Sequence, residues 1–361
     1  MDMTAVVIGG SLSGLMHAIM LRDLGSKVTV VEQEISDSRR GYDAGIRAGP
    51  DVVKFLEKYD RTNSKYHLHA ATQFVNKKDK PIFKSAKMMA WTSWGFLWSI
   101  LRKHFDSLET SDEKGDKCPS AFMQGRRVTG LKDLGSRIEV QVDDLISHST
   151  SSIDADIVIV ADGTNSTIRE QLLPNAVRKY AGYVSWRGVI PEAHVPEEYR
   201  QVFEGRVTFH LMHRSYIIVY VIPTDDGDME VGKRMYNFVW YVTASKGSKE
   251  LHDIMTDVDG HLHQGTVPRG LVRSAVWDEQ RAKSVAQMPP CIAHLLEKTE
   301  KPFVSKIYDI TSSKGVFHDG KVFLVGDALA TFRPHIGLST NQGLMKHGRK
   351  QCCDMRRSNH D

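Results

Sequence analysis

The sequence predicts an α/β protein with two domains, one organised around a parallel sheet and the other around a mostly antiparallel sheet. Its 361 residues suffice for about two domains of ordinary size, and a hydrophobic content of 41% can fill a core in each. The N-terminal segment combines apolar runs with a Gly-rich turn and a helical pattern. Residues 180–301 instead contain strand-like segments with aromatic side chains at near period 2.

The N-terminal segment reads as one β-α-β unit. Residues 5–8 are a short apolar run, residues 12–24 place apolar side chains at helical spacing, and residues 28–31 form a second apolar run. A glycine-rich turn joins the first strand to the helix, and Gly25 ends the helix. Strand, turn, helix and strand within about 30 residues are typical of a Rossmann-like dinucleotide-binding domain.

The turn carries a GxSxxG variant of the dinucleotide fingerprint, with Ser11 in place of the middle glycine. Gly9 permits the tight turn out of the strand, and Gly14 lets the helix lie close to the sheet, so that the helix N-terminus faces a pyrophosphate. Glu32 ends the second strand at the spacing of the acid that accepts hydrogen bonds from an adenosine ribose. The alternative is a Gly-rich turn in an α/β protein that binds no nucleotide.

Two later segments repeat the pattern of an apolar strand that ends in a polar turn. Residues 153–162 read IDADIVIVAD and lead into Gly163, and residues 322–327 read VFLVGD, with Gly326 and Asp327 at the end. Open α/β sheets bind their ligands at the carboxyl ends of strands, so both turns are expected to face a ligand. Ordinary Asp-Gly turn chemistry is the alternative for each turn taken alone.

Together, the elements at residues 9–14, 161–169 and 326–341 resemble the FAD-binding set of the group A flavoprotein monooxygenases, the FAD-dependent aromatic hydroxylases with the p-hydroxybenzoate hydroxylase fold. The third element fits the family pattern G-D-A-A-H-x-x-x-P-x-x-G-Q-G-x-N without a gap, although Ala330 replaces the histidine and Leu338-Ser339 replaces Gln-Gly. The stretch YAGYVSWRG at residues 180–188 most resembles the branch that includes 2,6-dihydroxypyridine 3-monooxygenase and related fungal monooxygenases.

The resemblance implies FAD as cofactor, with NADPH or NADH as reductant. It places Gly9, Ser11 and Gly14 at the FAD pyrophosphate, Glu32 at the adenosine ribose, and Asp327 at the ribityl chain or phosphates. Arg102 is also expected to reach the cofactor, and the alternative is that it is an ordinary exposed arginine on a helix. The full set of expected cofactor-binding residues is Gly9, Gly10, Ser11, Ser13, Gly14, Glu32, Gln33, Arg102, Asp162, Gly163, Gly326, Asp327, Pro334, Gly337, Leu338 and Ser339.

The middle of the chain is expected to form a sheet that holds an aromatic substrate against the flavin. Tyr183, Trp186, Tyr236 and Trp240 are the predicted substrate-binding residues, and Arg187, His210 and Tyr216 are further candidates to line the pocket. The family uses a His or Tyr as base, and the candidates here are His210, His213 and Tyr216. The alternative for each is a structural role, because most strand aromatics belong to a core and a lone histidine more often makes a structural hydrogen bond.

The function implied is that of an FAD-dependent monooxygenase. It would use NAD(P)H and O2, through a flavin C4a-hydroperoxide, to hydroxylate an aromatic or phenol-like small molecule, with a role in secondary metabolism. The alternative is a flavin-binding protein with a non-hydroxylating role: a cyclase, a scaffold, an oxidase, a Baeyer-Villiger catalyst or an inactive truncated homologue.

We expect a discontinuous FAD-binding domain of residues 1–75, 100–175 and 302–361. Residues 76–99 and 176–301 would form the substrate-binding domain. Residues 343–361 are polar and basic with little apolar periodicity, and the C-terminal helices of the family are therefore expected to be truncated.

Composition narrows the expected partners. The formal charge of +4 is close to balance and gives no argument for nucleic acid. The four cysteines lack metal-ligand spacing, and no apolar stretch reaches the ~20 residues of a membrane span. We therefore expect a cytoplasmic protein that binds no metal. The protein is also a possible homodimer.

Overall fold

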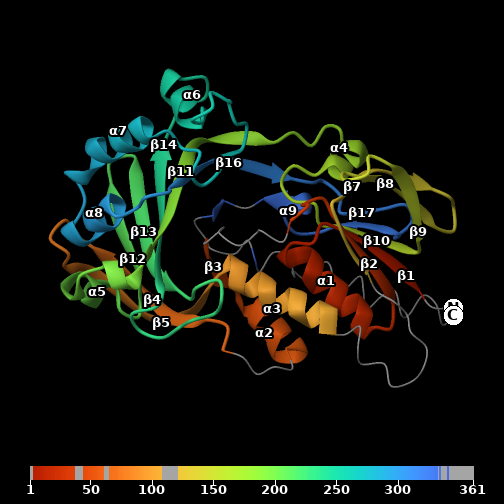
Figure 1. Cartoon of the computed structure of the whole chain (residues 1–361), viewed down its shortest axis with the longest axis horizontal. Coiled ribbons are helices and arrows are strands. Elements are labelled where there is room, and N and C mark those ends of the chain that lie inside the picture. Colours follow the sequence, from red (N-terminus) through yellow and green to blue (C-terminus); the bar gives the residue numbers. More distant parts are fainter. Residues whose placement is uncertain are drawn as a thin grey trace.

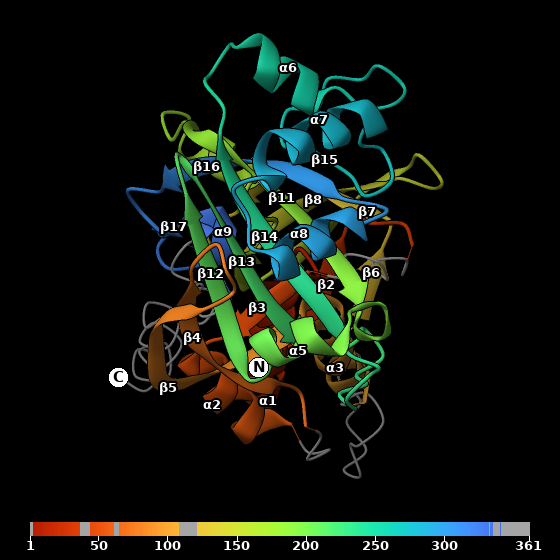
Figure 2. The ribbon, with the colours of Figure 1, turned by 90° about the vertical axis from the view of Figure 1, so that its left-hand side faces the viewer.

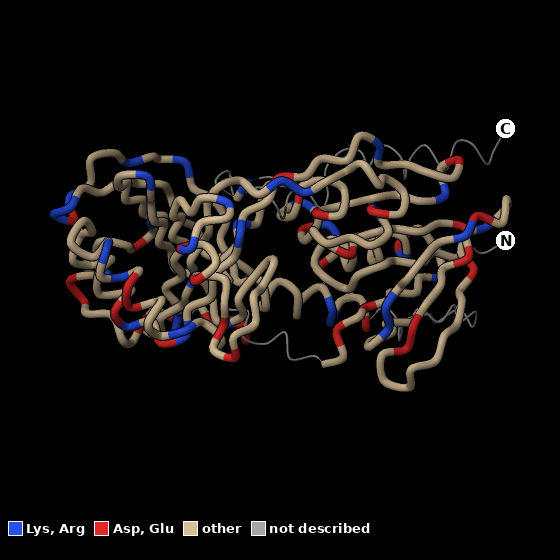
Figure 3. Tube along the Cα trace, turned by 90° about the horizontal axis from the view of Figure 1, so that it is seen from above, with Lys and Arg blue, Asp and Glu red and all other residues tan. Residues whose placement is uncertain are grey.

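The computed structural model describes residues 3–36, 44–60, 65–107, 121–331, 333–334 and 340. These residues form two lobes, each built on its own large sheet, and segments from both ends of the chain contribute to the lobe with α1 (Figure 1). Basic and acidic residues are interspersed over both lobes, so neither presents a single sign of charge (Figure 3). No helix in the described part of the chain is long and apolar enough to cross a membrane.

The first lobe contains the predicted parallel sheet. Its strand order is β17 (Val316–Phe317), β18 (Val322–Leu324), β10 (Ile157–Val160), β1 (Thr4–Ile8), β2 (Lys27–Glu32) and β6 (Ala121–Gln124). Every pair is parallel except β17 with β18. Since β1, β10 and β18 are neighbours, the three predicted ligand turns leave the sheet at the same edge.

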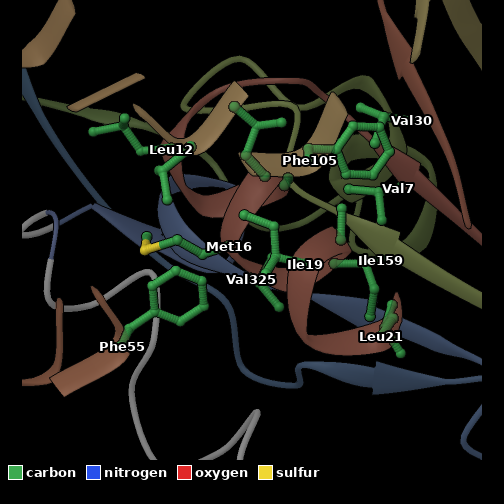
Figure 4. Close-up of a cluster of buried hydrophobic side chains, with 14 of the residues drawn as sticks. Val7, Leu12, Met16, Ile19, Leu21, Val30, Phe55, Phe105, Ile159 and Val325 are labelled. Carbon is green, nitrogen blue, oxygen red and sulfur yellow. The ribbon is translucent and has the colours of Figure 1, made fainter. Parts of the chain in front are cut away.

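Helices cover one face of this sheet and a small sheet covers the other. Val7, Val30 and Ile159 point from adjacent strands toward helices α1 (Leu12–Asp23), α2 (Pro50–Tyr59) and α3 (Trp94–Ser107), as Figure 4 shows. The opposite face packs against β7 (Arg126–Asp133), β8 (Ile138–Asp144), β9 (Thr150–Ala155) and α4 (Thr167–Leu172). The β1 sequence alternates between these two cores, which explains why all of its residues are apolar after Thr4.

The second lobe contains a ten-stranded, mostly antiparallel sheet. Its order is β15 (Thr266–Val267), β16 (Phe303–Thr311), β11 (Lys179–Pro191), β14 (Met235–Thr243), β13 (Ser215–Ile222), β12 (Arg206–Met212), β4 (Leu68–Val75), β5 (Pro81–Ser93) and β3 (Gly45–Ala48), and β19 (Ala330–Thr331) pairs with β16. Only β12 with β4 is parallel among these pairs. The mixed α/β fold with a parallel and a mostly antiparallel sheet is confirmed.

The outer face of the large sheet is covered by helices. These are the short helix η1 (Glu192–His194), α5 (Glu197–Phe203), α6 (Lys249–Met255), α7 (Ser274–Val285) and α8 (Pro290–Glu297). Figure 2 shows α5 and α8 lying in front of β12, β13 and β14. The short helix α9 (Gly326–Leu329) lies in the other lobe and follows β18. The opposite face of the large sheet is turned toward the first lobe, where the site lies.

Sheet pairing differs in places from the expected domain ranges. Strands β3, β4 and β16 fall within the range expected for the first domain, yet all three hydrogen-bond in the ten-stranded sheet. Most of α3 lies within the range expected for the first domain, and the helix packs against α1 of that domain. We keep the two-domain division as a proposal, with these strands assigned to the second domain.

Candidate active site

The first two turns of the parallel sheet touch each other. Gly9 has φ of +100°, and a Cβ built on it would lie 2.5 Å from the carbonyl oxygen of Ala161. Ala161 N donates to Ile8 O across 2.8 Å, directly before the turn at Asp162. A glycine is therefore required where the fingerprint predicts one, because any side chain would push the two turns apart.

Helix α1 begins immediately above the Gly9 turn. A Cβ on Gly14 would lie 1.9 Å from the Gly9 carbonyl oxygen, so the helix can approach this closely only with glycine at that position. Ser11 is the N-cap in extended conformation and makes no side-chain cap bond, and no acidic residue lies in the first turn. The positive end of the helix, which includes Ser13, is left for an anion.

Glu32 holds the fingerprint turn and borders the cavity. Its side chain is buried, Oε2 accepts from Gly10 N at 2.7 Å, and Oε1 accepts from Glu34 N at 2.8 Å. The carboxylate therefore fixes the spacing between the end of β2 and the turn after β1. Gln33 lines the same cavity.

The second and third turns contribute two carboxyl groups, each on a half-buried residue. Asp162 Oδ1 is buried and has no hydrogen-bond partner among the described residues, and burial raises the pKa of this carboxyl. Burial also raises the pKa of Asp327 to about 6. Gly163 and Gly326 both have positive φ and let the chain turn directly beside these acids. Two carboxyls in this state are suited to accept hydrogen bonds from hydroxyl groups of a ligand.

Arg169 ties these two turns together, although it is absent from the set of site residues expected from the sequence. It is fully buried on α4, which is capped by Ser166, and its guanidinium donates to Thr164 O at 2.7 Å and Ala328 O at 3.2 Å. The one signal in the sequence is an arginine within TNSTIRE, directly after the Asp-Gly turn.

The ring of Phe122 lies between Arg102 and the fingerprint turn. It forms an ion pair with Asp106 at 2.9 Å, and its guanidinium lies 3.8 Å from the ring centroid of Phe122. A Cβ on Gly10 would meet that same ring. Trp98, one turn earlier on α3, donates from Nε1 to Gly10 O at 2.8 Å, so the described contact to the turn comes from Trp98. A cofactor contact by Arg102 stays a prediction.

A cavity of about 740 Å³ lies where the turns meet the large sheet. Its lining combines the fingerprint acid Glu32, the third-turn acid Asp327 and Pro334 with residues of the second lobe. The full lining is Glu32, Gln33, Glu34, Ala44, Trp94, Thr164, Asn165, Arg178, Arg187, Gly265, Thr266, Phe303, Ser305, Lys306, Ile307, Tyr308, Asp327, Thr331 and Pro334. Sequence positions 32 to 334 thus converge on one ligand-sized space.

Comparisons with known proteins agree with this geometry. A family described as "Pyridine nucleotide-disulphide oxidoreductase" matches residues 4–87, and one described as "FAD binding domain-like" matches residues 180–309. The chain is 28% identical over 352 residues to 2,6-dihydroxypyridine 3-monooxygenase of Paenarthrobacter nicotinovorans, covering 97% of this chain and 80% of that protein. It is 25% identical to the FAD-dependent urate hydroxylase of Klebsiella oxytoca, covering 93% and 77%.

The structure gives the same result. That of 2,6-dihydroxypyridine-3-hydroxylase from Arthrobacter nicotinovorans superimposes with a TM-score of 0.80 at 25% identity, over 95% of this chain and 81% of the other. Over nearly its whole length the chain is similar to the FAD-dependent aromatic hydroxylase family. Members of this family are FAD-dependent monooxygenases, and the chain is an enzyme of this kind.

The described residues of this hydroxylase fit FAD. The approach of α1 at Gly14 and its uncapped N-terminus suit a pyrophosphate, and the buried, unpartnered Asp162 Oδ1 suits a hydroxyl donor. Asp327 and Pro334 lie on the cavity wall, where the resemblance places the ribityl chain and the flavin. Gly337, Leu338 and Ser339, the other expected cofactor residues, lie outside the described residues.

Strand alternation divides the predicted substrate residues of the hydroxylase between the two faces of the large sheet. Tyr183 and Tyr216 lie on the face turned toward the first lobe, in a cluster that includes Tyr220 and Tyr241. Trp186, Tyr236 and Trp240 are fully buried on the other face, against helices α5, α7 and α8. The proposed substrate site therefore excludes these three, because the sheet separates them from the cavity.

The three predicted bases also occupy different surroundings. His210 points to the helix-covered face, where Nδ1 contacts Val75 O at 3.0 Å and Nε2 contacts Gln287 O at 2.9 Å. His213 is exposed in the turn between β12 and β13. Tyr216 is half-buried on the cavity face, and burial raises the pKa of its phenol far above the ordinary value. Tyr216 therefore keeps its proton at neutral pH, and its phenol is better suited to donate a hydrogen bond than to act as a base.

Proposed function

We propose that the hydroxylase acts on a small aromatic or heteroaromatic ring that carries an ionisable hydroxyl or acid group. The observation that carries the proposal is Arg187, which projects from β11 into the cavity beside Tyr241 and Tyr220. A guanidinium in such a half-buried position favours an anionic oxygen on the ligand. The names of the relatives support this class, since dihydroxypyridine and urate are both hydroxylated nitrogen heterocycles.

A second polar group lies on the same face of β11. Ser185 is fully buried two residues from Arg187, and its Oγ has no hydrogen-bond partner among the described residues. It pairs across the sheet with Tyr241. Ser185 does not line the cavity, so Arg187 rather than Ser185 is the residue that can contact a ligand.

The remaining groups around Arg187 keep their protons and exclude water. Burial raises the pKa values of Tyr220 and Tyr241, so both phenols stay neutral and can donate. Tyr220 OH donates to Gly45 O at 2.7 Å, which ties the large sheet to β3. Apolar side chains such as Val239 complete this face. When bound and reduced by NAD(P)H, FAD supplies the activation of O2, and the protein supplies a dry, oriented position for the ring.

The cavity also offers a position for the phosphates of the reductant. Arg178 lies 4.1 Å from the ring centroid of Tyr308, its Nε is buried without a partner among the described residues, and Lys306 lines the same wall. Desolvation lowers the pKa of Lys306, as expected for a cation with no anionic neighbour among the residues that the structure describes. We propose that this wall attracts the pyrophosphate of NAD(P)H, since phosphate anions favour paired Arg and Lys groups.

The test compares Arg187→Gln with Arg127→Gln, a control at an exposed position of strand β7. Both purified variants should bind FAD as the wild type does. With hydroxylated pyridines and other phenolic rings under 18O2, Arg187→Gln should raise the KM for the ring about tenfold or more and leave FAD affinity unchanged. An unchanged KM would show that no ring anion contacts Arg187.

The same assay separates the alternative functions. Bound FAD without ring-stimulated NAD(P)H oxidation would favour a cyclase or scaffold, and H2O2 without oxygen incorporation would favour an oxidase. Oxygen inserted into a ring or chain bond would favour a Baeyer-Villiger catalyst. A homodimer, a cytoplasmic location and a role in secondary metabolism stay predictions, to be tested by sedimentation, by localisation and by the identity of the accepted ring.

A further inference from the structure

The hairpin of β4 and β5 exposes large apolar side chains at the edge of the large sheet. Ile82 is 69% exposed, Phe83 53% and Met88 52%. In the described part of the chain, β3 pairs only with residues 90–93 of β5, so the outer edge of residues 81–89 has no strand partner. Figure 2 shows β4 and β5 at one side of the sheet. Exposed apolar clusters on an open edge indicate an interaction surface.

The hairpin is held in place at its turn. Asn76 closes the turn, because its Oδ1 accepts from Lys78 N and Lys80 N and its backbone N donates to Lys80 O. Cys291 of α8 donates from Sγ to Asp79 Oδ1 at 2.8 Å. His210 contacts the carbonyl of Val75 at the end of β4. These contacts present the exposed side chains in a fixed geometry.

The same hairpin is strongly basic. Residues 76–89 read NKKDKPIFKSAKMM, and five lysines against one aspartate give them a formal charge of +4, as large as that of the whole chain. All five lysines are exposed: Lys77, Lys78, Lys80, Lys84 and Lys87. Asp79 accepts a hydrogen bond from Cys291, and its negative charge is already counted in the formal charge of +4.

We propose that the β4–β5 hairpin docks on an anionic lipid surface. Ile82 and Phe83 are adjacent on a strand and point to opposite sides of it, so one flat protein surface could cover only one of them. The headgroup region of a membrane can surround both, while the lysines extend their stems over apolar groups and keep their charges at the anionic headgroups. A second copy of this chain is disfavoured, because two edges with five lysines each repel.

The depth of docking is limited by the backbone. The open edge of β5 carries N–H and C=O groups that need partners, and hydrocarbon offers none. The hairpin would therefore stop at the boundary between headgroups and acyl chains, where water and phosphates are available. Phe83 also contacts Phe74, which stacks on Phe209 with ring centroids 5.0 Å apart, so docking would place one end of this aromatic row at the lipid surface.

Vesicle flotation of the full-length FAD-loaded protein tests the proposal. Vesicles of phosphatidylcholine mixed with phosphatidylglycerol should bind the protein at low salt, and vesicles of phosphatidylcholine alone should bind it about tenfold less or weaker. The triple variant K77E/K78E/K80E and the variant F83S should each lose about tenfold or more of the binding to anionic vesicles. Ring-stimulated NAD(P)H oxidation in solution should be unchanged in both, which keeps this test separate from that of the proposed function.

The matched control reverses the same number of charges elsewhere. K246E/K298E/K301E changes three exposed lysines outside the hairpin and should leave vesicle binding near that of the wild type. The proposal is overturned if anionic vesicles do not bind the protein at low salt, if neutral vesicles bind it equally, or if the control loses as much binding as the hairpin variant. Self-association in sedimentation that F83S abolishes, without vesicle binding, would assign the surface to a second copy instead.

Discussion

Gly14→Ala tests the packing on which the cofactor site depends. The substitution adds one methyl group in the first turn of α1, and its carbon would lie 1.9 Å from the Gly9 carbonyl oxygen. That oxygen cannot simply turn away, because Gly10 N, which lies in the same peptide plane, donates to Glu32 Oε2 at 2.7 Å. Helix α1 must therefore move away from the sheet.

The structure sets the size of this movement. A Cβ atom essentially never lies closer than 3.0 Å to a nonbonded atom, so helix and turn must separate by at least 1.1 Å. Overpacking of this kind costs about 1 to 3 kcal/mol of folding free energy. The amides of the α1 N-terminus move with the helix, and the loss of about 1.4 kcal/mol of pyrophosphate binding would weaken FAD affinity about tenfold.

Gly10→Ala is the matched control for this prediction. A Cβ on Gly10 would lie 2.4 Å from a carbon of the Phe122 ring, a side chain that can turn, whereas Gly14 faces backbone. The wild type should therefore be the most stable in urea unfolding of the apoproteins, followed by Gly10→Ala and then Gly14→Ala. FAD affinity, measured by quenching of flavin fluorescence, should decrease in the same order. If Gly14→Ala binds FAD and unfolds like the wild type, the close approach of α1 is not what forms the site.

Three further predictions follow from buried polar groups. Burial raises the pKa of Asp327 to about 6, so the folded apoprotein holds a proton that the unfolded chain releases from about pH 4 upward, and stability falls as pH rises through this window. Asp327→Asn should therefore stabilise the apoprotein by about 1 to 3 kcal/mol at pH 7, with the difference vanishing near pH 4 in urea unfolding, while FAD binds more weakly. Arg169→Lys keeps the positive charge but loses the branched guanidinium that donates to both Thr164 O and Ala328 O. Isothermal titration should therefore show an FAD affinity at least about tenfold lower. Equal affinity would mean that the two turns hold their positions without the guanidinium. His210→Gln should cost about 1 to 3 kcal/mol of stability and leave kcat of the folded enzyme unchanged, and a fall in kcat at intact stability would instead support the catalytic role predicted from the sequence.

Local patterns are sufficient to predict the fold class and the turns that meet at the candidate cofactor site. The apolar runs before Gly9, Asp162 and Gly326 each form a strand of the same parallel sheet. Parallel strands connected by helices must end at a common edge, so the sequence pattern already implies that the three turns meet. Glu32 follows from spacing alone and lies at the cavity as expected.

The substrate side cannot be predicted from the sequence at the level of residues. Period 2 in β11 shows that Trp186 and Arg187 point to opposite faces, but not which face the helices cover. Trp186 is expected in the site because aromatic side chains suit an aromatic ligand, and it lies instead in the core beneath α7. Arg187 is the residue of this pair that reaches the cavity.

The sequence by itself determined which segments become strands and helices and where glycines must stand, because those properties depend on neighbours within a few positions. The tertiary structure decided which face of the large sheet meets the cavity, that Arg169 joins two turns, and that Trp98 contacts the fingerprint. Each of these contacts joins residues that lie on different elements, and helix α3 reaches Gly10 across 88 positions of sequence. Their energies arise only when packing brings the elements together, so no local pattern encodes them.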